Sequence, residues 1–341
     1  MLEFDLIDQV RARIHPRPDV ILGIGDDAAI LQVPPDRQLV VATDTLNAGV
    51  HFPVDTAPAD IGWKALAVNL SDLAAMAAEP AWCTLSLSLP DSDADWLDRF
   101  LDGFLDLAAR HRIALVGGDT TRGPLSIGVT VHGLVEPGRA LRRDGARVGD
   151  DIWVTGSLGD AASALVLLQQ ASEPMLASAC EAGPILPADD AVDLRIAEAL
   201  AGLRSRLDRP TPRVEIGRGL AGVAHSGIDI SDGLLADLGH ICRGSRLAAE
   251  VEVDRLPYSP ALAESFGDAR RYELQATGGD DYELCFTAES AMRERIGLIA
   301  VANATPITRI GRMIEGEGVR AIGRDGAPWH PQRGGYVHFS D

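Results

Sequence analysis

The sequence predicts a mixed α/β (α+β) protein built from two domains. Runs with the two-residue alternation of β-strands stand between amphipathic helical stretches in both halves of the chain. A length of 341 residues suits about two domains, since domains commonly run to roughly 100–200 residues. A polar, glycine-rich and charged stretch, residues 139–151, separates the halves. We therefore expect a first domain at residues 1–138 and a second at residues 148–341.

The first domain is expected to open with an amphipathic helix and two strands. Apolar side chains recur every three or four positions over residues 3–14, which indicates one buried helical face. The side chains on that face are Phe4, Ile7, Val10 and Ile14. Apolar runs at residues 29–33 and 38–43 favour two strands, because the turn residues PPD stand between them.

Two longer helices and three further strands would complete this domain. Residues 58–78 are mostly apolar and predict a buried helix, which Pro80 would end. Residues 91–111 predict an acidic amphipathic helix. Its buried stripe would consist of Trp96, Phe100, Phe104 and Leu107. Strands are expected at residues 83–89, 113–116 and 125–135, and a GGDTTRG loop would separate the last two.

The second domain continues the mixture of strands and helices. Its strand runs are short and apolar, and its helical runs carry an apolar face. Strands are expected at residues 151–155, 227–230, 247–253 and 282–287. Helices are expected at residues 159–170, 190–206, 232–242 and 289–301. Short strands and turns would form the remaining C-terminal part.

Charge and composition exclude several classes of protein. The formal net charge is −19, whereas nucleic acids and anionic membranes select basic surfaces. The only lysine among 31 basic residues is Lys64, so the phosphate-binding loop GxxxxGK[ST] does not occur. No apolar run approaches the roughly 20 residues of a membrane span, and the N-terminus lacks a signal-peptide core. Four well-separated cysteines are typical of reduced core thiols, so we expect a cytoplasmic protein.

Aspartates stand among small or hydroxyl residues in five motifs: GIGDDAA, ATDTL, NLSDL, GGDTT and GIDISDG. The aspartates concerned are Asp26, Asp27, Asp44, Asp72, Asp119, Asp229 and Asp232. Mg²⁺ prefers oxygen ligands, and glycine lets backbone N–H groups approach phosphate oxygens. Turn and N-cap chemistry explains any single motif better. Five motifs flanked by apolar segments favour clustered carboxylates, whose repulsion divalent cations would neutralise.

The positions of these motifs predict a phosphate-binding site. Asp44 and Asp119 each follow a β-rich run, so we expect their side chains to meet at the edge of a sheet. Phosphate contacts are expected from Arg122 and from Arg142 and Arg143, because guanidinium groups bind phosphate bidentately. No HExxH, GxSxG or GxGxxG motif points to zinc, serine-hydrolase or dinucleotide chemistry. The residues therefore predict an enzyme that binds a polyphosphate through several Mg²⁺ ions.

Six ordered motifs give the chain a more specific resemblance. They are GIGDDAA, ATDTLNAGVHF, KALAVNLSDLAAMAAEPAW, GGDTTRGPL, GIDISDGLLADLGHI and GGDDYELCFT, spread over residues 23–286. Together they resemble the thiamine-monophosphate kinase family, in the superfamily of aminoimidazole ribonucleotide synthetase, selenophosphate synthetase and a hydrogenase-maturation dehydratase. The resemblance implies a two-domain PurM-like fold, with N-terminal domains that form a β-barrel across a homodimer and a C-terminal α/β domain packed against it. It also implies transfer of phosphate from ATP to thiamine monophosphate, which gives thiamine diphosphate and ADP.

The same resemblance implies roles for individual residues. Mg²⁺ would be held by Asp27, Thr43, Asp44, Asp72, Asp119, Asp229 and Asp232. ATP would contact Gly118, Asp119, Arg143 and Ser231, and thiamine monophosphate would contact His51, Asp280 and Tyr336. Two positions depart from the family pattern. Ala42 replaces a frequent serine, and Asp280 is one methylene shorter than the glutamate of the usual GGEDYEL.

The resemblance also predicts a mechanism without a catalytic base. The acceptor would be a phosphate monoester with a second pKa of about 6, so it is already ionised at neutral pH and can attack the γ-phosphorus of ATP in line. Selenophosphate synthetase relies on a reactive cysteine or selenocysteine and a lysine near the N-terminus, whereas Cys83 and Lys64 are the first of each kind here. A catalytically idle protein that binds nucleotide and Mg²⁺ is the alternative from another class.

Overall fold

The computed structural model describes residues 3–14, 17–178 and 190–332. The chain divides into two compact units, Met1–Arg142 with Thr211–Gly222 and Arg143–Pro210 with Val223–Asp341. The short segment Thr211–Gly222 carries helix α6 (Val214–Leu220) and packs with the first unit. The boundaries expected from the sequence, 1–138 and 148–341, stay a prediction. No helix in the described residues is both long and apolar enough to cross a membrane.

The first unit is built on a four-stranded sheet with the order β3-β6-β4-β5. The strands are β3 (Gln38–Asn47), β6 (Ser126–Val135), β4 (Glu79–Leu89) and β5 (Ala114–Arg122). β6 is antiparallel to both β3 and β4, whereas β4 and β5 are parallel. Within the described chain the sheet is open, and β3 and β5 are its two edges. Helix α1 (Glu3–Ala12) and a small ladder of β1 (Val20–Leu22) and β2 (Ile30–Leu31) precede it.

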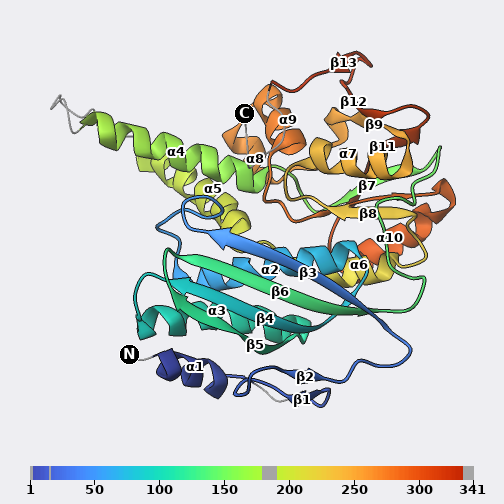
Figure 1. The fold of residues 1–341 in the computed structure, drawn as a ribbon. Helices are drawn as coiled ribbons and strands as arrows, with labels where there is room; N and C mark the ends of the chain where they lie inside the picture. Colours follow the sequence, from blue (N-terminus) through green and yellow to red (C-terminus); the bar gives the residue numbers. More distant parts are fainter. Residues whose placement is uncertain (1–2, 15–16, 179–189, 333–341) are drawn as a thin grey trace. The chain divides into compact units, whose positions relative to one another are not determined.

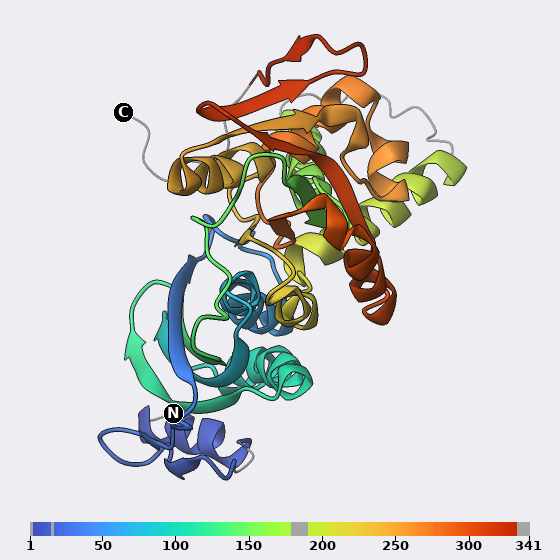
Figure 2. The same ribbon diagram turned by 90° about the vertical axis from the view of Figure 1, so that its right-hand side faces the viewer.

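Helices α2 (Pro58–Ala75) and α3 (Ala94–His111) lie together against one face of this sheet (Figures 1 and 2). α2 is buried along most of its length, as its apolar sequence predicts. The helices approach closely where Gly62 faces the Phe100 carbonyl and Gly103 faces the Ala59 carbonyl, since a Cβ at either glycine would overlap these oxygens. The aspartate at the N-cap of α3, Asp93, accepts hydrogen bonds from the first turn.

Two expectations for this unit are wrong. Pro80 does not end α2: the helix stops at Ala75, the chain reverses through Ala77 at a φ of 58°, and Pro80 lies in β4. The GGDTTR segment is not a loop between strands, because β5 continues through it to Arg122. Backbone pairing with the neighbouring β4 therefore overrides the loop preference of two consecutive glycines.

The second unit contains a seven-stranded sheet with the order β13-β12-β9-β11-β7-β10-β8. The strands are β7 (Asp151–Thr155), β8 (Ser226–Asp229), β9 (Ala248–Glu252), β10 (Leu284–Ala288), β11 (Ile307–Ile314), β12 (Gly318–Ile322) and β13 (Pro328–Trp329). The helices are α4 (Asp160–Ser178), α5 (Asp190–Asp208), α7 (Leu234–Ser245), α8 (Pro260–Ser265), α9 (Asp268–Thr277) and α10 (Arg293–Ala302), with 3₁₀ turns η1 (Val253–Arg255) and η2 (Ser290–Met292). The predicted mixed α/β class is thus confirmed.

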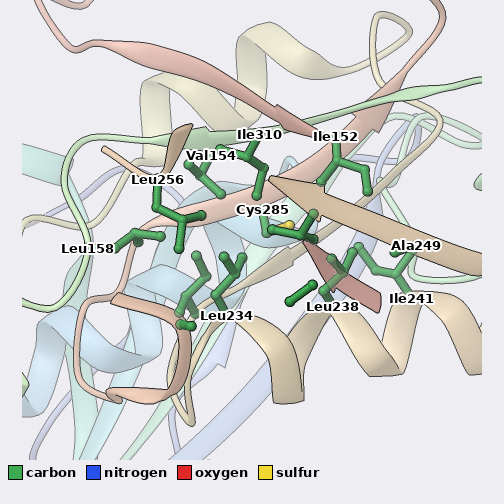
Figure 3. Packing of buried hydrophobic residues seen from close by; sticks show 14 of the residues in the cluster. Ile152, Val154, Leu158, Leu234, Leu238, Ile241, Ala249, Leu256, Cys285 and Ile310 are labelled. Atoms are coloured by element: carbon green, nitrogen blue, oxygen red, sulfur yellow. The ribbon is translucent and has the colours of Figure 1, made fainter. Parts of the chain in front are cut away.

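The core of the second unit lies between this sheet and α7 (Figure 3). Leu234, Leu238 and Ile241 of α7 pack in one cluster with Ile152 and Val154 of the central strand β7. All five side chains are almost fully buried. This packing fixes the start of α7 against the end of β8, which is where two of the motif aspartates lie.

Candidate functional site

The glycine-rich loop between β1 and β2 and the glycines of β5 line one pocket in the first unit. The pocket has a volume of about 580 Å³, and α1 contributes to its wall. Asp27 and Asp119, both exposed, lie on its lining, as do Gly117 and Gly118. The structure therefore brings the predicted residues Asp27, Gly118 and Asp119 together. Their backbone N–H groups and carboxylates are suited to a phosphate group and its cation.

Gly118 is required by its neighbour in the sheet. A Cβ at this position would lie 1.8 Å from the carbonyl oxygen of Leu85 on β4. A Cβ at Gly117 would meet only the Thr84 methyl group at 3.9 Å, an ordinary contact. Only glycine therefore lets the chain at position 118 run this close to β4 and still present Asp119 to the pocket.

A second group of polar residues joins β3 to α2. The backbone N–H of Asp44 donates to Asn69 Oδ1 at 3.0 Å, and Asn69 Nδ2 donates to the Ala65 carbonyl at 3.0 Å. Asp72 lies one helical turn beyond Asn69 and so on the same side of α2. Burial raises the pKa of Asp44 above its ordinary value. The structure thus joins Asp44 to the side of α2 that carries Asp72, through Asn69, which sequence reasoning left out of the site.

The expected meeting of Asp44 and Asp119 within one chain is wrong. Both residues lie inside strands, and these strands are the two opposite edges of the sheet. Pairing aligns Asp44 with Val129, Val129 with Leu85, and Leu85 with Gly118, the neighbour of Asp119. Three strand spacings separate the two positions, which is about 14 Å. One magnesium ion cannot bridge that distance.

Two further predicted positions lie on β3 beside Asp44. Thr43 Oγ1 donates to the Val129 carbonyl at 3.1 Å and accepts from Thr130 Oγ1 at 3.1 Å. Both hydrogen bonds of the Thr43 hydroxyl are therefore made with β6. The second lone pair of its oxygen is the one that could bind a cation. Ala42 pairs with Val131 in the same ladder and offers no side-chain oxygen.

His51 lies in the turn that follows β3. Its Nδ1 accepts a hydrogen bond from the Asn47 backbone N–H at 3.0 Å. The neutral ring therefore carries its proton on Nε2. Its carbonyl oxygen accepts from Lys64 Nζ at 2.9 Å, and Lys64 is only 1% exposed. Sequence reasoning did not assign this role to the single lysine of the chain.

The second unit brings four predicted residues together at the end of β8. Asp229 is the last residue of the strand, and Ser231 and Asp232 follow it. The Ser231 carbonyl accepts the N–H of Asp280 at 2.9 Å, which joins this turn to the GGDDY segment. Asp280 has a φ of 67°, and its Oδ1 accepts from the Tyr282 hydroxyl at 3.0 Å. Local strain and a fixed carboxylate are typical of a binding site.

One carboxylate organises this turn. Asp237 Oδ2 accepts the backbone N–H groups of Ser231, Asp232 and Gly233, each at 3.1 Å. Burial, together with the nearby Asp229, raises the pKa of Asp237 to about 7. Sequence reasoning missed Asp237, although an acidic residue in the first turn of a helix is the signal that finds such a contact.

The remaining predicted residues are less closely joined to this turn. Arg143 is exposed, and its carbonyl accepts from Ser245 Oγ at 3.1 Å. Burial lowers the pKa of His240, and the positive charges of Arg243 and Arg143 lower it further. The negative charge of Asp232 partly opposes this shift. Arg143 and Asp232 therefore both lie near His240. Tyr336 lies outside the described residues.

The donor chemistry of these groups fits magnesium. Carboxylates are the hard oxygen ligands that Mg²⁺ takes, and burial raises the pKa of Asp44, so a bound cation would favour its charged form. Within the described part of one chain, no three histidine, cysteine, aspartate or glutamate side chains are grouped to hold a metal ion. Within the units, the predicted ligands form two groups in the first unit and one in the second.

Comparison with known proteins identifies the family. The family model described as AIR synthase related protein, N-terminal domain, matches residues 25–135. A thiamine-monophosphate kinase of Escherichia coli (strain K12) is 44% identical over 340 residues, which cover 99% of this chain and 98% of that protein. The thiamine-monophosphate kinase of Aquifex aeolicus (strain VF5) is 34% identical over 341 residues, 99% of this chain and 98% of that protein.

Solved structures agree with the sequence relatives. The crystal structure of the thiamine-monophosphate kinase of Stenotrophomonas maltophilia K279a is 54% identical, with a TM-score of 0.83 over 96% of this chain and 97% of that chain. The structure of AaThiL complexed with AMPPCP and TMP is 32% identical, with a TM-score of 0.73 over 99% of this chain and 97% of that chain. The chain therefore belongs to the thiamine-monophosphate kinase family.

Proposed function

We propose that this protein transfers the γ-phosphoryl group of ATP to thiamine monophosphate, giving thiamine diphosphate and ADP in thiamine diphosphate biosynthesis. The observation that carries the proposal is similarity over nearly the whole chain to kinases of this specificity, one of them bound to AMPPCP and TMP. The grouping of Asp27, Gly118 and Asp119 around one pocket supports it, because a triphosphate needs such a surface. Proteins of the fold with other roles, such as the hydrogenase maturation protein HypE at 20% identity, support the fold alone.

The nucleotide would bind along the glycine-rich pocket of the first unit. Gly118 and Asp119 would contact its phosphates there, while Ser231 and Arg143 are the ATP contacts proposed in the second unit. Thiamine monophosphate would be held by His51, Asp280 and Tyr336. The carboxylate of Asp280 suits the positive charge of a thiazolium ring.

Magnesium would be held by the aspartates of the three groups and by Thr43. These ligands are Asp27, Thr43, Asp44, Asp72, Asp119, Asp229 and Asp232. Mg²⁺ bound there would neutralise the charge of the triphosphate and orient it. Asp237 would keep Ser231 and Asp232 in position through its three backbone contacts.

The transfer itself would be direct and in line. The acceptor phosphate is a monoester that is mostly ionised at neutral pH, so the protein need not remove a proton from it. The residues therefore act by holding the two phosphates at reacting distance and by excluding water. No phosphorylated enzyme residue forms, which predicts inversion of configuration at the γ-phosphorus.

A homodimer would complete the site. The open face of the sheet in the first unit exposes Leu39 to 46% and Val41 to 55%, and both edge strands lack a partner within the described chain. A second copy could close the two sheets into a β-barrel, which would bury this face and satisfy the edges. If β5 of one copy lies beside β3 of the other, Asp119 of the first copy would lie near Asp44 of the second.

We also propose a cytoplasmic location. Cys83, Cys242 and Cys285 are buried free thiols. Reduced core cysteines are typical of proteins in a reducing compartment.

Mass analysis of the product tests the proposed function. The protein would be incubated with ATP and Mg²⁺ and, separately, with thiamine monophosphate, thiamine or formylglycinamidine ribonucleotide. We expect thiamine diphosphate from the first acceptor alone, and a chelator should abolish its formation. Turnover of another acceptor, or nucleotide binding with no product, would contradict the proposal. With chiral γ-phosphorus, retention of configuration would contradict the single-step mechanism.

A further inference from the structure

The charged side chains that line the nucleotide pocket of the first unit are mostly acidic. Its charged lining residues are Asp8, Arg11, Asp26, Asp27 and Asp119. All of its lining residues belong to the described chain, and among them Arg11 is the one cation. Four carboxylates around one arginine would repel a triphosphate if no cation faced it. Among the lining residues, Arg11 is therefore the side chain that could attract an anionic ligand.

Arg11 reaches the glycine-rich loop from helix α1. Its Nη1 lies 2.9 Å from the position that a Cβ on Gly25 would occupy, and its Cζ lies 3.1 Å from the same point. Gly25 has a φ of 126°, which side chains rarely adopt. The missing Cβ thus makes room for the guanidinium group directly beside Asp26 and Asp27.

The neighbouring arginines of the first unit are already engaged in ion pairs. Arg13 pairs with Asp98 at 2.8 Å and with Asp102 at 2.6 Å, and these contacts tie α1 to α3. Arg17 pairs with Asp19 at 2.7 Å. Among the described residues, Arg11 forms no ion pair within 4.0 Å. Its donors are therefore available to a ligand in the pocket.

We propose that Arg11 is a further phosphate-binding residue for the nucleotide, supplied by α1 across the glycine-rich loop. This inference rests on the proposed nucleotide site. The guanidinium group presents a planar fork of N–H donors, which matches two oxygens of a phosphate group. It would supply a fixed positive charge on the side of the pocket that carries Asp26 and Asp27. The carboxylates would remain free to act on the cation that accompanies ATP.

Binding of AMPPCP with Mg²⁺, measured by calorimetry without acceptor, tests Arg11 apart from the phosphoryl transfer. The variants are Arg11→Gln, Arg11→Lys and the control Arg13→Gln, which removes an arginine of α1 that pairs with α3 and does not line the pocket. Loss of a charge-assisted contact should weaken binding about 10-fold to 100-fold in Arg11→Gln. Arg11→Lys should recover part of the affinity, and Arg13→Gln should stay within about 2-fold of the parent protein. In steady state, Arg11→Gln should raise KM for ATP and leave KM for thiamine monophosphate nearly unchanged.

Three results would overturn the inference. They are equal affinity of Arg11→Gln and the parent protein, equal weakening by Arg13→Gln, and a parent protein that binds no AMPPCP. The second result would mean that Arg11 acts only through the placement of α1. A parent protein that binds AMPPCP but makes no thiamine diphosphate would contradict the proposed function and leave the comparison of variants valid.

Discussion

Lys64 Nζ donates a hydrogen bond of 2.9 Å to the carbonyl oxygen of His51, and so joins the middle of α2 to the turn after β3. The lysine is 1% exposed, and burial of its charge is costly unless it has polar partners. The other side of the same turn is held by the bond from the Asn47 N–H to His51 Nδ1. Together these contacts fix both the backbone and the ring of His51, the proposed acceptor-binding residue.

Replacement of this lysine should weaken acceptor binding. Lys64→Met keeps most of the side-chain volume but removes the donor to His51. Because a hydrogen bond from a charged group contributes about 1.5–3 kcal/mol, we expect KM for thiamine monophosphate to rise roughly 10-fold. KM for ATP should change less than about 2-fold. Steady-state kinetics measures both, and an equal rise in the two KM values would show that Lys64 supports the unit as a whole and does not act through His51.

Removal of a proposed metal ligand should abolish activity and spare the fold. Asp44→Asn and Asp119→Asn each keep the shape of the side chain and remove its charge. We expect turnover to fall by about 100-fold or more in each variant. The unfolding temperature of Asp44→Asn should not fall, because burial already raises the pKa of this carboxyl and disfavours its charged form. Near-normal turnover at low Mg²⁺ in either variant would disprove its role as a ligand.

A mixture of these two inactive variants tests the shared site. If Asp44 of one copy works with Asp119 of the other, a mixed dimer holds one site with both changes and one site with neither. After random exchange of subunits, about a quarter of the parent activity should return. The matched control is exchange of each variant with itself, which should restore nothing. A mixture as inactive as its parents would show that the two residues do not meet between copies.

Much of the fold could be predicted from local patterns. α3 follows from its amphipathic stripe and β6 from its alternation, because each pattern reports burial on one side of a single element. The course of β5 could not be predicted in this way. Its GGDTTR segment is extended because β4 pairs with it along its length, and a local reading of two glycines contains no information about that partner.

The residues of the site, like the fold, could be predicted only in part from the sequence. The motifs of glycine and aspartate predicted that Asp27, Asp44 and Asp119 belong to a site for magnesium and phosphate. The distance between Asp44 and Asp119 could not be predicted, because it depends on the strand order β3-β6-β4-β5, which places these two residues on opposite edges of the sheet. Asp237 differs from these residues, because its three partners are near it in sequence and its place in the first turn of α7 is a signal that the sequence contains.

His132 should make the stability of the first unit depend on pH. Burial lowers the pKa of its imidazole below the ordinary 6.5, although a backbone contact with Trp82 partly opposes this. The unfolded chain then binds the proton more tightly, so stability is present above pH 6.5 and is lost as pH falls through the lowered pKa. His132→Gln should flatten this dependence by a few degrees in the unfolding temperature between pH 8 and pH 5. An unchanged difference between the two pH values would assign the acid sensitivity to other groups.

Adjacent glycines in β5 should respond very differently to the same substitution. A methyl group at position 118 would lie 1.8 Å from the Leu85 carbonyl oxygen, so Gly118→Ala must push β5 away from β4. Overpacking of this kind costs about 1–3 kcal/mol, and movement of the strand should also displace Asp119 and weaken AMPPCP binding. Gly117→Ala adds the same methyl group at 3.9 Å from Thr84 and should change the unfolding temperature little. Thermal unfolding of the two variants provides the comparison. Equal unfolding temperatures of the two variants would mean that β5 can shift away from β4 without cost. The close pairing of these strands would then not be what positions Asp119.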